Sequence, residues 1–516
     1  MPAPTITPGP LAVAFDSACA RLDRLEFADA LWNRRLEVWT ADPRVRDLIA
    51  HRLGWLEALA FLTPHLPRLR ALADSLRGEP VTDIVLLGMG GSSLAPEVLR
   101  QVLGVAPGLP RFRMLDSVDP DAVADAMANA STSLFILASK SGTTIEPNVM
   151  AAEARRRIVA SGEAQWGPRV LAITDEGTAL HRRALDERFR DVFVNPADIG
   201  GRYSALSFFG MVPAALMGAD LDRIVDGARA MEAACRTRQA AANPGLALGA
   251  LMAAGTQTGR DKLTLLLPPK LQSLGLWVEQ LVAESTGKQG KGIVPIAGET
   301  SAVPLGPDRL VVSVTVTGEG PADAPLAQAR ATGAPLVELD LPDVHAIGAE
   351  FLRWEVATAT AGLLLGINPF DEPNVQQAKD ATRGLLDAYS AHGRLPLAEP
   401  HGAVHGARLT LSAAAEERLA GAGADAFLRV LDPGPGSGGA SDYFGLLAYL
   451  PPEDPAFAAV LEEWRSNVAM QTGCATMFGY GPRYLHSTGQ LHKGGANNGV
   501  FVVITAEVSH DLSIPG

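Results

Sequence analysis

Short runs of aliphatic and β-branched residues, each closed by a turn, alternate with helical stretches through the middle of the chain. One series holds DIVLLG, SLFILAS, RVLAIT and DVFVN, and a second holds KLTLLLP, GIVPI, RLVVSVTV and APLVELDL. Strands that alternate with helices are typical of βαβ units around a parallel sheet. The sequence therefore predicts an α/β protein with two such units in tandem.

The segments on either side of these units follow other patterns. From Phe15 to Arg77 apolar residues recur at helical spacing, which predicts a helical lead-in. After Leu395 a linker leads to an amphipathic helix, the run DYFGLLAYL, a helix over Pro455–Gln471 and a strand GVFVVIT, with a loop at Asp432–Gly439. With 516 residues the chain has room for several domains, and we expect them at 1–80, 81–245, 246–395 and 396–516.

Composition excludes several classes of partner. The chain has 57 acidic and 44 basic residues and a formal net charge of −13, so a nucleic-acid backbone would be repelled. The N-terminus lacks the charged region of a secretory signal, and the longest uncharged stretch is broken by Asn243-Pro244-Gly245, so we expect no membrane partner. Cys19, Cys235 and Cys474 are too far apart to suggest a disulfide framework or zinc site. We expect a soluble, cytoplasmic protein.

Two turns between a strand and a helix carry residues suited to an anion. In Gly88–Ser93 the glycines let the backbone approach a ligand, although the third glycine of a dinucleotide loop is missing and a plain tight turn is the alternative. Ser139–Thr144 combines four hydroxyls with Lys140 at a helix N-terminus, without the order of a nucleotide-binding P-loop. This second turn predicts a cradle for one phosphate, against the alternative of a hydroxyl-rich helix cap.

Three charged residues are candidates for the chemistry next to that phosphate. Arg202 follows two glycines in Gly200–Ser204, which could let its side chain reach into a cleft and hold an anionic oxygen. A salt bridge at the surface is the simpler interpretation. Gln280 and Glu284 lie four residues apart and share one helix face, so Glu284 could be partly desolvated and act as a general base, or lie solvated at the helix end. Lys379 follows Asp371-Glu372-Pro373 at a helix start and would more often be solvated.

Histidines occur in two Gly-bearing segments. His486 lies among hydroxyls and glycines in LHSTGQLHKGG, a setting that favours acid–base work over the more frequent structural role. His401 and His405 have no cysteine or carboxylate beside them at ligand spacing, so we predict no metal site.

Taken together, these segments resemble the glucose-6-phosphate isomerase family, which has two sugar-isomerase α/β domains. The matching segments are VLLGMGGSSLAPEVL, SKSGTTIEP, GGRYSALS, WVEQLVAESTGKQGKG, NPFDEPNVQQAKD and LHSTGQLHKGG. The sequences of the lead-in and of the C-terminal part are most similar to the isomerase part of bacterial transaldolase/glucose-6-phosphate isomerase fusion proteins. Since no transaldolase segment precedes it here, the resemblance implies isomerase activity alone, with a helical lead-in and a C-terminal α/β extension.

The resemblance also implies roles for the matched residues. Those matching the phosphate and ring contacts are Gly91, Ser92, Ser139, Lys140, Ser141, Thr144 and Gln280. Those matching the chemical steps are Arg202 for the enediolate, Glu284 for the proton transfer between C2 and C1, and the pair Lys379 and His486 for ring opening. The implied substrate is a small sugar phosphate, glucose 6-phosphate or fructose 6-phosphate, and no metal or other cofactor is implied.

Two departures from the family pattern bear on the site. The histidine segment follows both the Glu284 helix and the Asp371-Glu372-Pro373 segment, whereas in most of the family it lies between them. Glu372 stands where the family commonly has glutamine. His345 is an alternative source of the imidazole, and a homodimer is open as an assembly. The competing functions are a dual phosphoglucose/phosphomannose isomerase and a sugar-phosphate sensor that lacks turnover.

Overall fold

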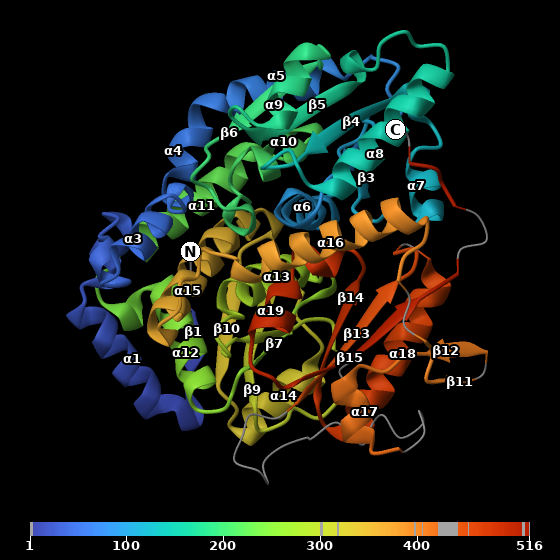
Figure 1. Cartoon of the computed structure of the whole chain (residues 1–516). Coiled ribbons are helices and arrows are strands. Elements are labelled where there is room, and N and C mark those ends of the chain that lie inside the picture. Colours follow the sequence, from blue (N-terminus) through green and yellow to red (C-terminus); the bar gives the residue numbers. More distant parts are fainter. Residues whose placement is uncertain are drawn as a thin grey trace.

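The computed structural model describes residues 4–299, 303–316, 319–396, 399–404, 406–421, 442–452, 454–507 and 511–514. The predicted loop at Asp432–Gly439 and His405 lie outside these residues. Figure 1 shows one sheet in the upper part of the molecule, a second below it, and a third, in orange and red, beside the second. Within the described ranges, no helix is long and apolar enough to cross a membrane.

The first sheet is entirely parallel and has the order β3-β2-β4-β5-β6. Its strands are β2 (Asp83–Leu87), β3 (Arg111–Leu115), β4 (Ser133–Ala138), β5 (Val170–Asp175) and β6 (Asp191–Asn195). The residues of β2, β4 and β5 are all buried, as expected for a parallel sheet covered by helices on both faces. The four predicted runs are β2, β4, β5 and β6.

The second sheet has the order β1-β10-β9-β7-β8. Its strands are β1 (Thr5–Thr7), β7 (Lys262–Leu266), β8 (Val294–Ile296), β9 (Arg309–Val316) and β10 (Leu336–Leu341). Strands β7 to β10 are parallel, and β1 pairs antiparallel with the edge of β10. The N-terminal segment predicted as helical therefore also supplies a strand. With three residues, β1 is too short to show the alternation of apolar and polar side chains that predicts a strand.

The third sheet is also parallel and has the order β14-β13-β15. Its strands are β13 (Tyr443–Tyr449), β14 (Ala475–Tyr480) and β15 (Gly499–Thr505), and a small hairpin of β11 (Gly402–Val404) and β12 (Ala407–Leu409) precedes them. Helix α18 (Pro455–Thr472) is the crossover between β13 and β14. This sheet explains the strands predicted at both ends of the C-terminal segment. The domain limits at residues 80, 245 and 395 stay predictions.

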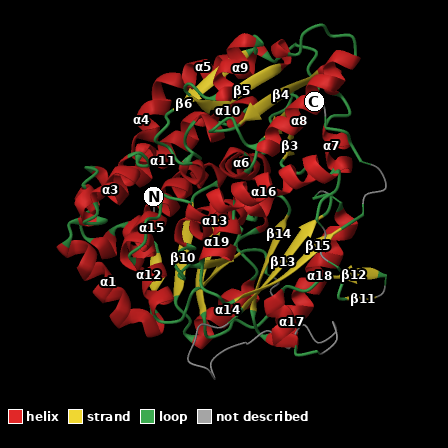
Figure 2. Cartoon of the chain, viewed as in Figure 1, coloured by secondary structure: helices red, strands yellow, loops and turns green. Residues whose placement is uncertain are grey.

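Helices cover the sheets and form the centre of the molecule (Figure 2). The N-terminal helices are α1 (Ala12–Arg24), α2 (Phe27–Trp32), α3 (Pro43–Ala50), α4 (Ala58–Leu62) and α5 (Leu66–Ser75). Those of the first unit are α6 (Leu94–Leu103), α7 (Pro120–Ala126), α8 (Ile145–Ala160), α9 (Ala179–Asp186), α10 (Phe208–Leu216) and α11 (Leu221–Cys235). The rest are α12 (Pro244–Gln257), α13 (Leu274–Thr286), α14 (Asp323–Thr332), α15 (Ile347–Leu365), α16 (Pro373–His392), α17 (Ala413–Leu419) and α19 (Gly489–Gly494).

Helix α15 is buried along its whole length and packs against α12. The helices touch at Gly249, where an added Cβ would lie 2.4 Å from the carbonyl oxygen of Ala357. Asn243 caps α12, because its side chain accepts hydrogen bonds from the amides of Gly245 and Leu246. A cap, a Pro at the first turn and an apolar surface on all sides explain why this uncharged stretch forms a buried helix.

A buried arginine joins the third sheet to the second. Arg465 of α18 donates to the carbonyl oxygens of Ala297 (2.8 Å) and Gly298 (3.0 Å), which follow β8, and to the Thr476 hydroxyl of β14 (3.0 Å). Glu299 accepts from Arg309 (2.8 Å) and from the amide of Thr476 (2.9 Å). A buried guanidinium is stable only where acceptors surround it, so this network fixes the C-terminal segment against β8.

Replacing Arg465 with methionine should loosen this junction. The carbonyls of Ala297 and Gly298 would lose their buried donor, so we expect the free energy of unfolding in urea to fall by about 3 kcal/mol. Arg70→Met is the control, because Arg70 and Asp222 form an exposed pair, and it should cost less than about 1 kcal/mol. Equal losses in the two variants would contradict the assigned role of Arg465.

Candidate active site

The two predicted anion loops lie side by side at one edge of the first sheet. Gly88–Ser93 follows β2 and Ser139–Thr144 follows β4, and these strands are hydrogen-bonded neighbours. The strand order reverses at this point, because β3 lies on the other side of β2. Ligands of open α/β sheets bind at the carboxyl ends of strands where the order reverses. The fold therefore puts both loops at the expected position of a ligand.

The first loop is wedged between two other segments. An added Cβ at Gly91 would lie 2.1 Å from the carbonyl oxygen of Gly201, so the two backbones touch and no side chain fits between them. At Gly90, which has a φ of +55°, an added Cβ would lie 2.6 Å from the carbonyl oxygen of His486. Ser92 is buried in the same turn. The glycines are therefore required here by close backbone contacts.

The second loop presents hydroxyls around the first turn of α8. The hydroxyls of Ser139 and Thr144 lie 3.3 Å apart, and those of Ser141 and Thr143 lie 3.0 Å apart. The amide of Gly142 donates to the Ser139 hydroxyl over 3.1 Å. Thr144 occupies the cap position of α8 without a capping hydrogen bond from its side chain. The loop therefore combines several hydroxyls with the N-terminal end of a helix, which suits an anion.

Lys140, in the same loop, is engaged elsewhere. Its ammonium forms an ion pair with Asp175 at the end of β5 and donates to the carbonyl oxygen of Ala197 over 2.7 Å. Burial raises the pKa of Asp175, although Lys140 acts in the opposite direction. The ammonium is thus held by the sheet in this structure, and its expected contact with phosphate stays a prediction.

The side chain of Arg202 is buried and faces Glu284. Arg202 lies in the short helix η8 (Gly201–Tyr203), and its Nε donates to the Ser285 hydroxyl over 2.8 Å. Its Nη2 donates to the carbonyl oxygens of Pro369 (2.8 Å) and Asp371 (2.9 Å). The remaining nitrogen, Nη1, lies 3.3 Å from a carboxylate oxygen of Glu284. Three fixed contacts therefore place Nη1 beside the candidate base, and the same nitrogen also donates to Glu372 over 3.3 Å.

The carboxyl of Glu284 lies near the end of α13, with its side chain 16% exposed. Burial raises its pKa, and the nearby charge of Glu372 adds to the rise, while Arg202, Lys288 and His486 act in the opposite direction. A carboxyl with a raised pKa beside a fixed guanidinium can accept a proton from a carbon acid and release it again. The geometry therefore supports a base at Glu284.

His486 reaches the candidate site from the third sheet. It ends the short helix η13 (Arg483–His486) after β14, and its carbonyl oxygen accepts from Gln280 of α13 over 2.8 Å. Its ring Nε2 lies 2.8 Å from a carboxylate oxygen of Glu146 in the first turn of α8. In the following helix, Gln490 donates to the carbonyl oxygen of Gly287 over 2.9 Å. The structure thus brings His486, Gln280 and the phosphate loop together within one chain.

Two other predicted candidates are less defined. Lys379 lies in α16, and its side chain is outside the part of the chain that the structure describes. His345, the alternative source of an imidazole, lies 3.4 Å from Asp343 in the short helix before α15. This contact lies within the segment before α15 and does not involve Glu284.

Glu146 and Lys288 lie at the site but are absent from the sequence-predicted set. Glu146 is in the quoted segment SKSGTTIEP, but its partner is 340 residues away, which no local signal reveals. Lys288 is buried, and its ammonium donates to the carbonyl oxygens of Asn368 (2.8 Å) and Asp371 (2.6 Å) and to the Asp371 carboxylate (2.7 Å). Burial, with the charge of Arg202, lowers the pKa of Lys288 to about 8. Lys288 follows Glu284 closely in the sequence, and this was the one signal that could have added it to the predicted site.

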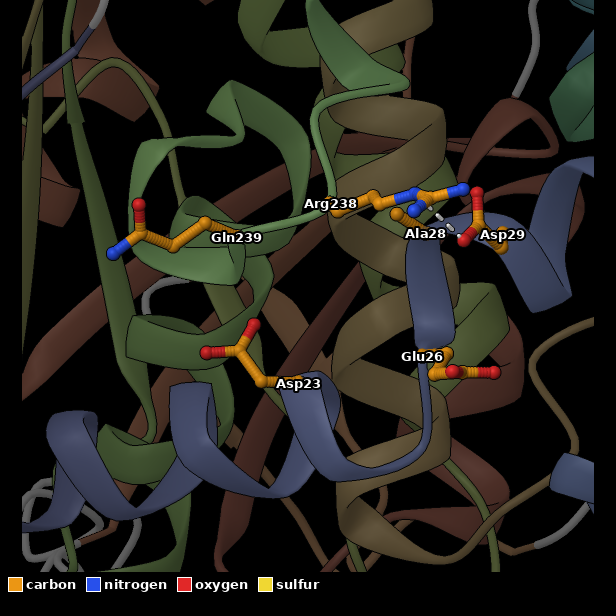
Figure 3. Close-up of a pocket in the computed structure, with 6 residues that line it drawn as sticks. All are labelled: Asp23, Glu26, Ala28, Asp29, Arg238 and Gln239. Carbon is orange, nitrogen blue, oxygen red and sulfur yellow. Dashed lines mark ion pairs between the residues drawn. The ribbon is translucent and has the colours of Figure 1, made fainter.

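A separate hollow lies between the N-terminal helices and the turn after α11 (Figure 3). It has a volume of about 290 Å³ and is lined by Asp23, Glu26, Ala28, Asp29, Arg238 and Gln239. Its single arginine is paired with Asp29 over 3.0 Å, and the remaining acidic side chains would repel a phosphate. Among the described residues, no cluster of three or more His, Cys, Asp or Glu could hold a metal ion.

Replacing Gly91 with alanine should destabilise the contact between the two loops. The new Cβ would overlap the backbone of Gly201, so we expect the free energy of unfolding to fall by about 2 kcal/mol, as for other overpacked sites. Gly384→Ala in α16 is the matched control, because nothing lies within 4 Å of its Cβ position, and alanine should add about 0.5 kcal/mol to the stability of that helix. Thermal unfolding that is unchanged in Gly91→Ala would contradict the close approach.

Sequence comparison gives a consistent family. The phosphoglucose isomerase family matches residues 73–306. The glucose-6-phosphate isomerase of Prochlorococcus marinus is 28% identical over 415 residues, which cover 72% of this chain and 74% of the relative. That of Rubrobacter xylanophilus is 29% identical over 418 residues and covers 69% of this chain and 95% of the relative. The matched span contains both anion loops, Arg202 and Glu284.

Comparison of structures agrees with this result. A hypothetical protein of Thermus thermophilus has a TM-score of 0.61 and 26% identity, covering 74% of this chain and 99% of that protein. A glucose-6-phosphate isomerase of Chlamydia trachomatis has a TM-score of 0.54 and 20% identity, covering 66% and 75%. The predicted α/β fold with two sugar-isomerase-type sheets is confirmed. Residues 73–306 thus match the phosphoglucose isomerase family, and a larger part of the chain is similar to glucose-6-phosphate isomerases.

Proposed function

We propose that the chain catalyses the reversible isomerisation of glucose 6-phosphate and fructose 6-phosphate in the cleft between the two anion loops, Arg202 and Glu284. The observation that carries the proposal is the pair of Glu284 and Arg202, 3.3 Å apart, beside loops suited to a phosphate. A sensor would need the phosphate loop but no such base. The reaction belongs to glycolysis and gluconeogenesis, and a cytoplasmic location is part of the proposal.

Proton transfer between C2 and C1 is assigned to Glu284. In the forward direction its carboxylate takes the proton from C2 of the open-chain aldose, which gives a cis-enediolate, and returns it to C1 to give the ketose. Negative charge grows on the substrate oxygen during this step, and the N–H of Arg202 Nη1 is fixed in advance to stabilise it. Because the pKa of Glu284 is raised, its carboxylate form is lost on acidification at a higher pH than for an ordinary glutamate.

The phosphate anchor is assigned to the hydroxyls of Ser139, Ser141 and Thr144 and to the first amides of α8. Ser92 and the backbone at Gly91 border the sugar from the neighbouring loop. Lys140 would leave Asp175, or act on the phosphate through its charge alone. An anchor of this kind holds C1 and C2 in place next to the base, so that the reaction needs little further ordering.

Ring opening is assigned to His486, with Lys379 as the expected second group. Burial alone would raise the pKa of Glu146, but the hydrogen bond and charge of His486 outweigh it and lower that pKa. A carboxylate paired with one ring nitrogen orients an imidazole for proton transfer at a sugar oxygen. The imidazole comes from the same chain as Glu146, so the late position of the histidine segment is compatible with a role of His486 in this site. A homodimer stays a proposal, which a measurement of the mass in solution would test.

Glu284→Gln should abolish most of the turnover. The amide keeps the size of the side chain but cannot accept the proton, so we expect kcat to fall by about 100-fold or more, with KM for fructose 6-phosphate nearly unchanged. A coupled assay of glucose 6-phosphate formation measures both constants. Glu176→Gln, at an exposed position after β5, is the control and should behave like the wild type. Full turnover in Glu284→Gln would remove Glu284 from the mechanism, and an inactive wild type would refute the proposed reaction.

Ser141→Ala combined with Thr144→Ala should weaken substrate binding. The phosphate is held equally in the ground state and the transition state, so KM should rise by about tenfold while kcat changes little. The same assay at saturating and limiting fructose 6-phosphate separates the two constants. Ser161→Ala with Thr332→Ala removes two exposed hydroxyls and is the matched control. An unchanged KM would show that the phosphate is bound elsewhere.

A further inference from the structure

The turn at Arg52 brings the N-terminal helical segment to the edge of the active-site cleft. Arg52 lies between α3 and the short helix η3 (Gly54–Glu57). The amide of Gly54 donates to the carbonyl oxygen of Asp198 over 3.0 Å, which fixes the turn against the stretch that leads to Arg202. A Cβ at Gly200 would lie 3.9 Å from Cδ of Arg52. The side chain of Arg52 therefore runs along the segment that carries Arg202.

Glu372 lies between two arginines. One of its carboxylate oxygens is 3.3 Å from Nη1 of Arg202, the same nitrogen that faces Glu284, and the other is 3.7 Å from Nη2 of Arg52. Within the described residues, Glu372 is the one carboxylate in ion-pair distance of Arg52, and Nη1 of Arg52 donates a hydrogen bond to the carbonyl oxygen of His51. Glu372 thus competes with Glu284 for Arg202, and Arg52 offers it a second cation.

The local charge is balanced only when Arg52 is counted. The carboxylates of Glu284, Glu372 and Asp371 face the cations of Arg202, Lys288 and Arg52. Without Arg52 one negative charge would be uncompensated in a cleft that has to admit a phosphate. Arg202 would also be drawn more strongly to Glu372, and less of its charge would reach the reacting oxygen. The charge of Arg52 also acts to lower the pKa of Asp175, the partner of Lys140, although burial outweighs it.

We infer that Arg52 is a positioning residue of the isomerase site, which neutralises Glu372 and so keeps Arg202 available to the substrate. This inference rests on the proposed function. It explains how the chain keeps the acidic residue Glu372 next to Arg202. Arg52 acts through Glu372 and needs no contact with the sugar.

The test is a double-mutant cycle with Arg52→Met, Glu372→Gln and the combined variant. In Arg52→Met we expect KM for fructose 6-phosphate to rise about fivefold, because the unpaired carboxylate repels the substrate and binds Arg202. Glu372→Gln removes that carboxylate, so the combined variant should have a KM within about twofold of Glu372→Gln alone. Arg52→Lys should recover most of the wild-type KM. Arg44→Met, at an exposed position in α3, is the control for loss of a surface arginine.

The pH dependence of kcat/KM gives a second readout. The charged groups that face Glu284 are Arg202, Glu372, Lys288 and His486. Loss of Glu372 removes a negative neighbour, so the acid limb should move to lower pH in Glu372→Gln, and it should move to higher pH in Arg52→Met. A merely structural role for Arg52 would lower stability without moving this limb.

Two results would overturn the inference alone. The first is additivity in an active enzyme. If the effects of Arg52→Met and Glu372→Gln on the KM for fructose 6-phosphate add in the combined variant, Arg52 does not act through Glu372. Arg52→Met could fail to fold. In that case, an acid limb that does not move in Glu372→Gln, or a KM in Arg52→Lys that rises about fivefold, would refute the inference. A wild type without turnover would instead refute the proposed function, and the inference with it.

Discussion

Arg202 is buried, with a side chain only 3% exposed, and its guanidinium contacts groups from two distant stretches of the chain. Ser285 comes from the end of α13, and Pro369 and Asp371 come from the turn before α16. A charged group inside a protein is stable only where oriented acceptors replace water. The first sheet, α13 and the turn before α16 must therefore pack in one arrangement, and this arrangement also leaves one N–H group for Glu284.

The three parallel sheets supply the other groups by one geometric rule. The anion loops follow β2 and β4 of the first sheet, and His486 follows β14 of the third. Side chains after the carboxyl ends of parallel strands can converge on a common cleft, whatever the order of the strands along the chain. The histidine segment can thus reach the candidate site from late in the chain, because the Arg465 network holds β14 next to β8.

The strands of the first sheet and the turns that follow β2 and β4 could be predicted from the sequence, because both have local signals. The runs at β2, β4, β5 and β6 are mostly apolar, and the loop at Ser139–Thr144 is rich in hydroxyls. Local patterns did not predict β1, which has three residues, or the pairing of partners far apart. Lys140 with Asp175 and His486 with Glu146 are pairs of this second kind, since each partner alone is an ordinary polar residue. Tertiary packing, rather than composition, decides them.

The turn from Asn368 to Glu372 connects the fold to the electrostatics of the site. Lys288 and Arg202 both donate to the carbonyl oxygen of Asp371, and Lys288 also holds the carbonyl oxygen of Asn368. Two buried cations thereby fix the backbone of the turn from one side, so the next residue, Glu372, has little freedom to move away from Arg202. Its charge then has to be met by neighbouring cations, and the pKa of Glu284 reflects the balance between them. The positions of Arg202 and Lys288, and with them the positive charge that Glu284 faces, are therefore set by the same small group of backbone carbonyls.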